Sequence, residues 1–532
     1  MRTILFCALA ALCLTAQEKP LTRESMLEDT RTLLRGIEDV HPDPYTAFGG
    51  RIAFQREAQA LLRGLPAEGL TPLALSEYLS PFMARLKDGH TGWRFPKQEE
   101  GPGLPLTFKV VGEELVLVAA GSAEALGSRL VSVGGLGLAQ LRARVNQLQG
   151  CENPSGELQA LVERLETKIG LISLLGLKAQ GSLAVILKGP DGREQKLNLA
   201  PGPLPLKRMT PATGVKHMPA RGTIAWSFLD TGGHTALLAI RNCRAFRENA
   251  VYGLTNGSGG ARAVVERIFR EQEGRAPKDD AEILATFPSA FDTFTELAKA
   301  MKAKGTTNLV VDLRENSGGN SLIGEMLVYV LQGPDGVKRL EGGYSITRLS
   351  SMVLELRGAA WLKGLNEGRA VPLVAGDYLF DSELRFREGR QDPDQWKSGL
   401  LMFPAMEAEL KEPTRAGIYK PARVIALCSA VTFSAGFDVL LSLQRTGATL
   451  IGVSPSQAAN CFIDVPFLTL PHSKLKAMIS SKAAFGFPDD PVKGRMLPCD
   501  LPLTYDKFKA LGFDPNAEVL MALDVAQAPT EP

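Results

Sequence analysis

The sequence is organised around residues Ala422–Val453, which read ARVIALCSAVTFSAGFDVLLSLQRTGATLIGV. Arg423–Cys428 is a short apolar run with β-branched residues, which is typical of a buried strand. Small and hydroxylated residues follow, and from Ser434 apolar side chains recur at helical spacing until Gly447 ends the helix. Thr449–Val453 is a second apolar run. The stretch therefore predicts a strand, a tight turn, a helix and a further strand, which together form a βαβ unit.

Ser434 lies where the predicted helix begins. Unpaired N–H groups at a helix N-terminus carry partial positive charge, which stabilises an oxyanion that develops beside the hydroxyl. The alternative is a plain N-cap serine, because serine is a common helix cap. Whether Ser434 is a nucleophile or a helix cap depends on other parts of the sequence.

Two further blocks bear on this choice. Asn308–Ser321 reads NLVVDLRENSGGNS and predicts a buried strand, a polar turn that ends in Gly318–Gly319, and a helix from Ser321. A glycine pair after a strand turns the backbone sharply and leaves N–H groups free to point at a ligand. Leu86–Phe95 reads LKDGHTGWRF and places His90 in a polar turn flanked by glycines.

Together the three blocks resemble the S41 family of serine peptidases, which includes the C-terminal processing peptidases and the tricorn core protease. The family pattern is Asp-Gly-His-Thr, then Asp-Leu-Arg-x-Asn-x-Gly-Gly, then Ser-Ala opening a helix. These blocks stand here, in the same order, as Asp88–Thr91, Asp312–Gly319 and Ser434–Ala435. The resemblance implies a spiral α/β catalytic domain of the ClpP and crotonase type. The alternation of strands and helices after Gly222 itself predicts a mostly parallel, layered α/β sheet.

The base that activates the serine separates two branches of the family. A serine hydroxyl needs a base within hydrogen-bond reach. The processing peptidases use a lysine after the strand that follows the nucleophilic helix, but Gly452–Phe462 contains no lysine. The tricorn-like members use the histidine of the first block. The resemblance therefore implies a serine-type peptidase of the tricorn-like branch, with Ser434 as nucleophile and His90 as base.

Resemblance also implies an oxyanion hole. Its donors would be the backbone N–H groups of Gly318 or Gly319, in the glycine turn, and of Ala435, directly after the serine. Turns that end neighbouring strands at one edge of a sheet can converge on the same point.

The acid that orients the histidine is harder to place. In tricorn-like enzymes it is a glutamate in a block near the chain end, which corresponds here to Pro488–Asp500, PDDPVKGRMLPCD. The matching position holds Val492 or Lys493, so Asp489 or Asp490 would serve after a small shift in register. We take Asp490 as the candidate acid.

Other polar residues of these blocks have structural interpretations. Asp88 is expected to form the turn before His90. Asp312 and Arg314, at the end of a strand, are expected to form an internal ion pair that holds the turn. The five histidines are scattered and show no metal-binding spacing, so we expect no metal and no cofactor.

The chain divides into several regions. Residues 1–16, MRTILFCALAALCLTA, have one arginine before an apolar core that is too short to span a bilayer, which is typical of a signal peptide. We therefore predict export to the periplasm or the extracellular medium. The remaining predicted regions are an N-terminal helical domain at 17–100 that ends in the DGHT turn, a PDZ-like domain at 101–204, and a catalytic domain at 205–532 with insertions near 247–290 and 339–412.

The PDZ-like prediction rests on Gly127–Leu141, GSRLVSVGGLGLAQL, which resembles the hallmark stretch of that fold. Strand-like runs precede it at 106–111 and 114–119 and follow it at 182–187 and 194–199. The groove of such a domain takes an extended peptide by strand addition.

The composition of the chain limits the classes of molecule that it is expected to bind. The 532 residues carry a formal charge of +2 and no basic run with interleaved aromatic residues, so nothing indicates nucleic-acid binding. No segment after the leader is long and apolar enough for a transmembrane helix. We expect the substrate to be an extended peptide or the C-terminal end of an unfolded protein. Two alternatives remain: a non-catalytic binding protein on the same fold, and an esterase that uses the same dyad.

Overall fold

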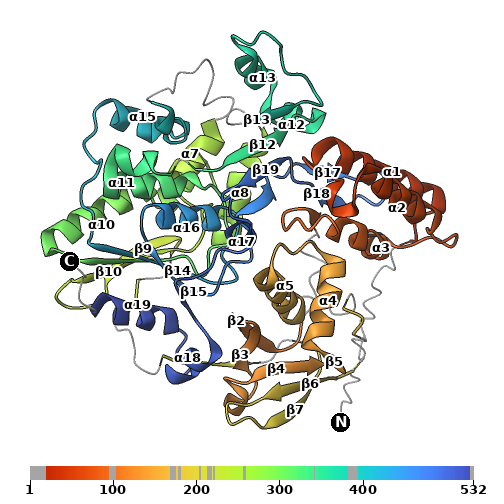
Figure 1. Ribbon diagram of the computed structural model, residues 1–532, viewed down its shortest axis with the longest axis horizontal. Helices are drawn as coiled ribbons and strands as arrows, with labels where there is room; N and C mark the ends of the chain where they lie inside the picture. Colours follow the sequence, from red (N-terminus) through yellow and green to blue (C-terminus); the bar gives the residue numbers. More distant parts are fainter. Residues whose placement is uncertain are drawn as a thin grey trace, which may run out of the picture.

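The computed structural model describes residues 19–94, 103–167, 175–177, 181–202, 205–211, 218–219, 222–255, 259–340, 342–380 and 394–527. The predicted signal peptide at residues 1–16 lies outside the described residues. No helix within these ranges is both long and apolar enough to cross a membrane. The described chain has a mixed α/β fold that contains four sheets (Figure 1).

Three N-terminal helices lead to the turn that carries His90. They are α1 (Arg23–Val40), α2 (Arg51–Arg63) and α3 (Pro72–Ala84). Their apolar sides share one core with residues in and around two strands from near the C-terminus, β17 (Phe467–Thr469) and β18 (Lys476–Met478). The short strand β1 (Gly92–Arg94) pairs antiparallel with β18. The turn is therefore fixed by α3 on one side and by β1 on the other.

An antiparallel sheet with two helices follows, in the region predicted to be PDZ-like; we call it the β2–β8 module. Its strands are β2 (Leu106–Val111), β3 (Glu114–Ala120), β4 (Arg129–Val133), β5 (Leu136–Gly137), β6 (Leu183–Lys188), β7 (Glu194–Leu199) and β8 (Lys207–Arg208). The main order is β2-β3-β4-β6-β7, with β5 beside β4 and β8 beside β3. The helices are α4 (Leu138–Leu148) and α5 (Pro154–Thr167). The assignment as a PDZ domain stays a prediction.

The central sheet carries the serine and glycine blocks. Its order is β20-β15-β14-β11-β10-β9, and every pair is parallel except β9 with β10. The strands are β9 (Ile224–Phe228), β10 (Thr235–Ile240), β11 (Asn308–Asp312), β14 (Arg423–Cys428), β15 (Thr449–Gly452) and β20 (Leu501–Pro502). The predicted strands around residues 236, 309, 423 and 449 are thus confirmed, and so is the mostly parallel α/β sheet. The spiral arrangement implied by the resemblance stays a prediction.

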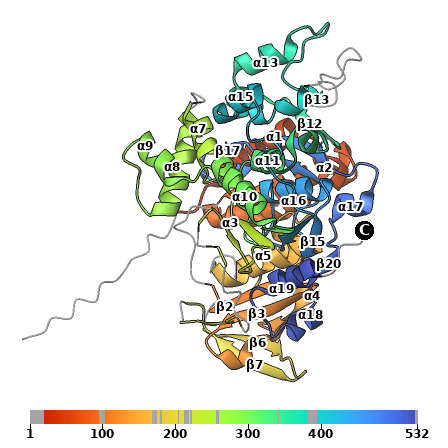
Figure 2. The ribbon, with the colours of Figure 1, turned by 90° about the vertical axis from the view of Figure 1, so that its left-hand side faces the viewer.

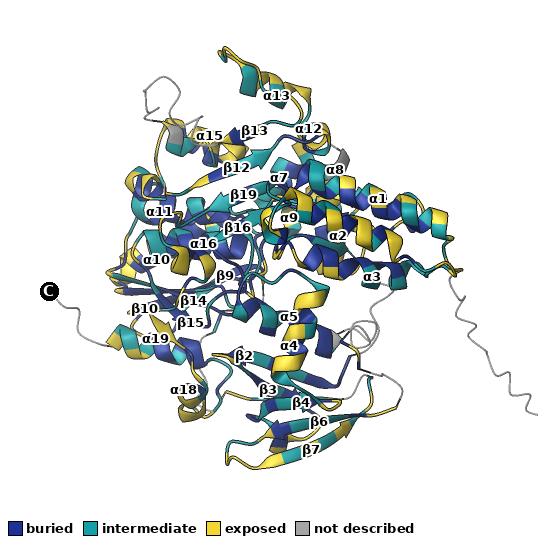
Figure 3. Ribbon diagram, turned by 45° about the vertical axis from the view of Figure 1, so that its right-hand side comes forward, coloured by how far each residue is buried: buried dark blue, intermediate teal, exposed yellow. Residues whose placement is uncertain are grey.

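Both faces of the central sheet are buried, which explains why its strands are continuous apolar runs. Side chains that alternate along the strands face two different cores: Leu309 and Val311 contribute to one, and Val310 to the other. Helices α10 (Ala290–Lys304), α11 (Leu322–Lys338) and α16 (Ala435–Arg445) cover the first face. Helix α19 (Ala517–Gln527) and the β2–β8 module share the core of the second face (Figures 1 and 3).

The two predicted insertions contain regular structure. Helices α7 (Arg247–Thr255), α8 (Gly259–Glu273) and α9 (Asp280–Thr286) form a small cluster with its own apolar core, on one side of the sheet (Figure 2). The second insertion includes β12 (Tyr344–Arg348), α12 (Ser351–Arg357), α13 (Ala359–Asn366), β13 (Tyr378–Phe380) and α15 (Pro404–Lys411). Strands β13 and β12 extend a sheet with β19 (Lys482–Phe485) and β16 (Asn460–Ile463).

Candidate active site

Ser434 connects β14 to α16 in an uncommon backbone conformation. Its φ is 52° and its ψ is −130°, in a region that residues with a side chain rarely adopt. Such strain persists only where the surroundings impose it, and it is frequent at active sites. The Ser434 N–H donates to Oε1 of Gln457 at 2.5 Å, and the hydroxyl makes no capping hydrogen bond to the helix. The structure therefore does not support the N-cap alternative.

The glycine turn lies directly against the serine. Gly318 has φ 109°, and a Cβ at this position would lie 2.6 Å from Ser434 Cβ. Gly319 has φ 144° and forms a parallel bridge with Cys243, where a Cβ would lie 2.1 Å from the Cys243 oxygen. Because neither position tolerates a side chain, this pair of glycines is required for the turn to reach Ser434.

The backbone donors of the predicted oxyanion hole are not equivalent. The N–H of Gly318 already donates to Oδ1 of Asn316 at 2.9 Å. In the part of the chain that the structure describes, the N–H groups of Gly319 and Ala435 donate to no protein acceptor. Ala435 is the first residue of α16, where an N–H has no partner within the helix. Of the two glycines left open by the sequence, Gly319 is the one with an available donor.

His90 is packed against the residue that precedes the nucleophile. Its ring stacks on Phe433, with centroids 4.5 Å apart and an angle of 30° between the planes. Both ring nitrogens are buried, and among the described residues neither has a partner at hydrogen-bond geometry. Burial lowers the pKa of His90, although Asp88 opposes this shift. A neutral imidazole has the protonation state that a general base needs.

Asp88 forms the turn before His90 and is fully committed to it. Oδ1 accepts the N–H of His90 at 2.8 Å, and Oδ2 accepts the hydroxyl of Thr91 at 2.5 Å. Nε2 of the buried His41 lies 3.4 Å from Oδ2. Burial raises the pKa of Asp88, but the hydrogen bond and charge of His41 outweigh it and hold that pKa below its usual value.

Glu152 is the acid that the structure brings to His90, and the sequence did not indicate it. It lies in the loop between α4 and α5, with Oε1 3.9 Å from Nδ1 of His90. The predicted acid, Asp490, lies elsewhere: it caps the short helix α17 (Pro491–Arg495) and lies 3.9 Å from Nζ of Lys493. Within the described residues no contact joins Asp490 to His90. The Asp-Pro pair at 490–491 is a common helix start and could have indicated a cap.

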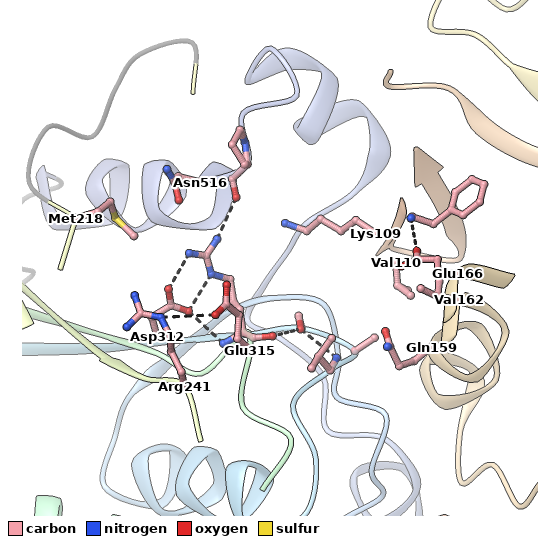
Figure 4. A pocket seen from close by; sticks show the side chains of 16 residues that line it. Lys109, Val110, Gln159, Val162, Glu166, Met218, Arg241, Asp312, Glu315 and Asn516 are labelled. Carbon is pink, nitrogen blue, oxygen red and sulfur yellow. Dashed lines mark hydrogen bonds and ion pairs between the residues drawn. The ribbon is translucent and has the colours of Figure 1, made fainter. Parts of the chain in front are cut away.

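Asp312 and Arg314 form a saturated ion network on the other side of the glycine turn. Arg314 donates to both oxygens of Asp312, at 2.9 and 2.7 Å, and to Glu518 at 2.8 Å. Glu518 also pairs with Lys109 of the β2–β8 module at 2.6 Å. This network lines a cavity of about 440 Å³ between the central sheet and the module (Figure 4). Asp312, Arg314, Glu518 and Lys109 therefore pair with one another.

A metal would have to use Asp88, His90 and Glu152, whose ligand atoms lie within 4.8 Å of one another. The oxygens of Asp88 accept the N–H of His90 and the hydroxyl of Thr91 and lie beside Nε2 of His41, and each oxygen of Glu152 accepts a backbone N–H. A cation would have to displace bonds that hold the turn.

Part of the chain is similar to a known protein family. Residues 284–460 match the model of peptidase family S41. No curated protein matches the sequence. Among solved structures, mature CPAF is 15% identical, with 95% of this chain and 99% of that chain covered and a TM-score of 0.56. The photosystem II D1 C-terminal processing protease is 13% identical over 91% of this chain and 94% of that chain, with a TM-score of 0.39.

Ser434, the glycine turn and strands β11, β14 and β15 lie in the matched segment, whereas His90 and Glu152 lie outside it. The fold and this match define the chain as a serine-type peptidase. The similarity to peptidase family S41 covers residues 284–460 and favours an enzyme over a non-catalytic binding protein.

Proposed function

We propose that the protein is an exported serine endopeptidase in which Ser434 is the nucleophile and His90 the general base. The observation that carries the proposal is the placement of His90. A buried histidine without a hydrogen bond to either ring nitrogen stacks on the residue before a strained serine. A buried, unpaired polar group is costly for folding, so such a group indicates a functional role.

The proposed reaction follows the acyl-enzyme route. The Ser434 oxygen attacks the carbonyl carbon of the scissile peptide bond, and its proton passes to Nε2 of His90. The negative oxygen of the tetrahedral intermediate accepts hydrogen bonds from the N–H groups of Gly319 and Ala435. The C–N bond then breaks, and His90 returns the proton to the leaving amine. Water, deprotonated by His90, hydrolyses the ester and regenerates Ser434.

Histidine is favoured over lysine as the base by the loop after β15. This loop, residues 453–459, reads VSPSQAA and contains no lysine. It contributes Gln457, whose side chain accepts the N–H of Ser434 and also donates to Cys461. Gln457 is uncharged and cannot accept the serine proton, so it holds the backbone of the nucleophile.

Export and substrate class rest on the sequence. The leader at residues 1–16 supports transport out of the cytoplasm. An extended peptide or the end of an unfolded chain fits an enzyme whose oxyanion donors are backbone groups at a sheet edge. The same dyad would also hydrolyse esters, so the experiment has to compare both substrates.

The test is labelling of the mature protein with a fluorophosphonate probe, with the adduct mapped by mass spectrometry. We expect the adduct on Ser434 and its complete loss in Ser434→Ala. The matched control is Ser442→Ala, on the same helix, which should label like the wild type. Cleavage of internal bonds in a quenched peptide library, lost in Ser434→Ala, would support the endopeptidase. An unlabelled, folded wild type would contradict the proposal.

A further inference from the structure

Glu152 is positioned far more firmly than a loop glutamate needs to be. Its Oε1 accepts the N–H of Gly89 at 3.0 Å, and its Oε2 accepts the N–H of Ala458 at 2.7 Å. One donor belongs to the His90 turn, and the other belongs to the loop that holds the Ser434 backbone through Gln457. The side chain is only 4% exposed. A single carboxyl group thus links the β2–β8 module to both halves of the active site.

The loop around Glu152 fits tightly against the His90 turn. A Cβ at Gly150 would lie 2.4 Å from the Asp88 oxygen, so the two backbones are in direct contact. Nδ2 of Asn153 donates to the carbonyl of Pro455 at 3.0 Å, which fixes the other side of the loop. Helices α3 and α4 also pack together near this point (Figure 1). The packing of this loop therefore fixes the position of the Glu152 carboxyl group.

The other acidic side chains near His90 interact with other groups. Asp88 bonds His41, Thr91 and the backbone of its own turn. Asp464 is 46% exposed and lies 3.8 Å from Arg357. Glu152 is the acid that faces Nδ1 of His90, and this nitrogen has no hydrogen-bond partner in the described structure.

We propose that Glu152 is the positioning residue for His90, and that the β2–β8 module thereby supplies one member of the catalytic group. This inference rests on the proposed Ser434–His90 function. Ionised Glu152 accepts a hydrogen bond from Nδ1–H, which keeps the proton on Nδ1 and leaves the lone pair on Nε2 free for the hydroxyl of Ser434. The distance of 3.9 Å has to shorten to hydrogen-bond length, about 2.6–3.2 Å, as substrate binds.

The protonation state of Glu152 gives the proposal a distinctive signature. Burial, and then the charge of Asp88, raise the pKa of Glu152 to about 8, although the two backbone donors oppose this. Protonated Glu152 can donate to Nδ1 and so favours the wrong tautomer of His90. The reaction should therefore accelerate as the pH rises through about 8.

Other titratable groups surround the pair and have to be considered in the profile. They are Asp88 on the His90 turn, Cys461 and Asp464 at β16, Cys151 and Glu157 around α5, and Arg85, Lys87 and Arg495 at the rim of the neighbouring cavity. Burial raises the pKa of Cys461 and Cys151 well above that of Glu152, so neither thiol ionises in the same range.

The experiment is the rate constant of fluorophosphonate labelling at Ser434 between pH 6 and pH 9.5. We expect the wild-type rate to rise to a plateau above about pH 8. Glu152→Gln should label about 10²–10⁴-fold more slowly and lose this step. Glu152→Asp keeps the charge, so it should label at an intermediate rate and keep the step.

The matched control is Glu166→Gln. Glu166 lies on α5 and accepts the N–H of Phe108 at 2.5 Å, and burial raises its pKa to about 7 (Figure 4). It should label like the wild type, which separates a role at His90 from the general effect of removing a buried carboxyl group. Circular dichroism and thermal melting establish that each variant is folded.

The outcomes separate the two claims. A wild type without an adduct on Ser434 contradicts the proposed function itself. A labelled wild type with Glu152→Gln equal to Glu166→Gln in rate and pH profile overturns the role of Glu152. If Glu152→Gln does not fold, the decision passes to Glu152→Asp: loss of the pH step in that variant also overturns the role.

Discussion

Two buried charged clusters lie on either side of the glycine turn, and they differ in how completely their charges are paired. The guanidinium of Arg314 donates four hydrogen bonds, two to Asp312 and one each to Glu518 and the Pro515 carbonyl, so its charge is fully paired. His90 has two buried ring nitrogens without a hydrogen bond, and Glu152 stands 3.9 Å from one of them. Burial removes both clusters from water and costs them solvation free energy. The ion pairs of the Arg314 cluster offset this cost, whereas His90 has no such partner.

This difference indicates how the chain separates stability from chemistry. The paired cluster ties the central sheet to α19 and to the β2–β8 module through Glu518 and Lys109. The unpaired cluster keeps groups available for a substrate. Changes to the first should affect folding, and changes to the second should affect rate.

The largest effect is expected for His90→Ala, measured as the labelling rate of Ser434. Loss of the general base should slow labelling by about 10³-fold or more. Stability should change little beyond lost packing on Phe433, because the ring makes no hydrogen bond that is broken. His234→Ala is the control, since His234 is 74% exposed in a loop and should leave labelling unchanged. Equal rates for the two variants would contradict the assignment of His90.

Arg314→Met is expected to give the largest loss of stability. It leaves Asp312 and Glu518 as buried carboxylates without their main partner, which costs about 3–5 kcal/mol. Urea unfolding measures this value. The fraction that remains folded should still label at Ser434 with a rate near that of the wild type. A stable Arg314→Met variant with slow labelling would contradict the assignment of this cluster to stability and not to rate.

The pH dependence of stability tests, without mutation, whether the buried carboxyl groups have raised pKa values. Burial raises the pKa of Glu152 to about 8 and of Glu166 to about 7. The folded state therefore binds more protons than the unfolded state between about pH 4.5 and 8, so the free energy of unfolding should fall as the pH rises through this range. Urea unfolding at pH 5, 6.5 and 8 tests this, and Glu152→Gln should show a smaller fall. A free energy that rises from pH 5 to 8 would show that these carboxyl groups are already ionised in the fold.

The smallest effect is expected for Lys109→Met, within the saturated cluster. Lys109 is 20% exposed, and Glu518 keeps its bond to Arg314 when the lysine is removed. The loss should be about 1–2 kcal/mol, clearly below that of Arg314→Met. Equal losses for the two variants would mean that the network depends on its total charge and not on the central arginine.

The elements of the site that form from contiguous sequence could be predicted. The strand at Arg423–Cys428, the helix after Ser434 and the glycine turn follow from short-range patterns, because each is a contiguous strand–turn–helix segment. What the sequence did not reveal was which glycine keeps a free N–H. That depends on Asn316, whose side chain reaches back to Gly318.

The acid could not be predicted in the same way. Glu152 lies in another module and reaches His90 only because its loop packs on two segments that are distant in sequence. Locally, Cys151-Glu152-Asn153-Pro154 reads as an ordinary helix start, and nothing in the pattern distinguishes this glutamate from others. Asp490 was chosen by its position in a family block, where the structure instead uses it to cap α17.

The most direct test of the account is a crystal structure of the protein after reaction with the fluorophosphonate. We predict a phosphonyl group on Ser434, with its oxygen accepting from the N–H groups of Gly319 and Ala435. His90 should direct Nε2 at the serine oxygen and donate from Nδ1 to Glu152 at hydrogen-bond length. An adduct whose oxygen points away from both N–H groups, or a His90 whose Nδ1 bonds a different acid, would contradict it.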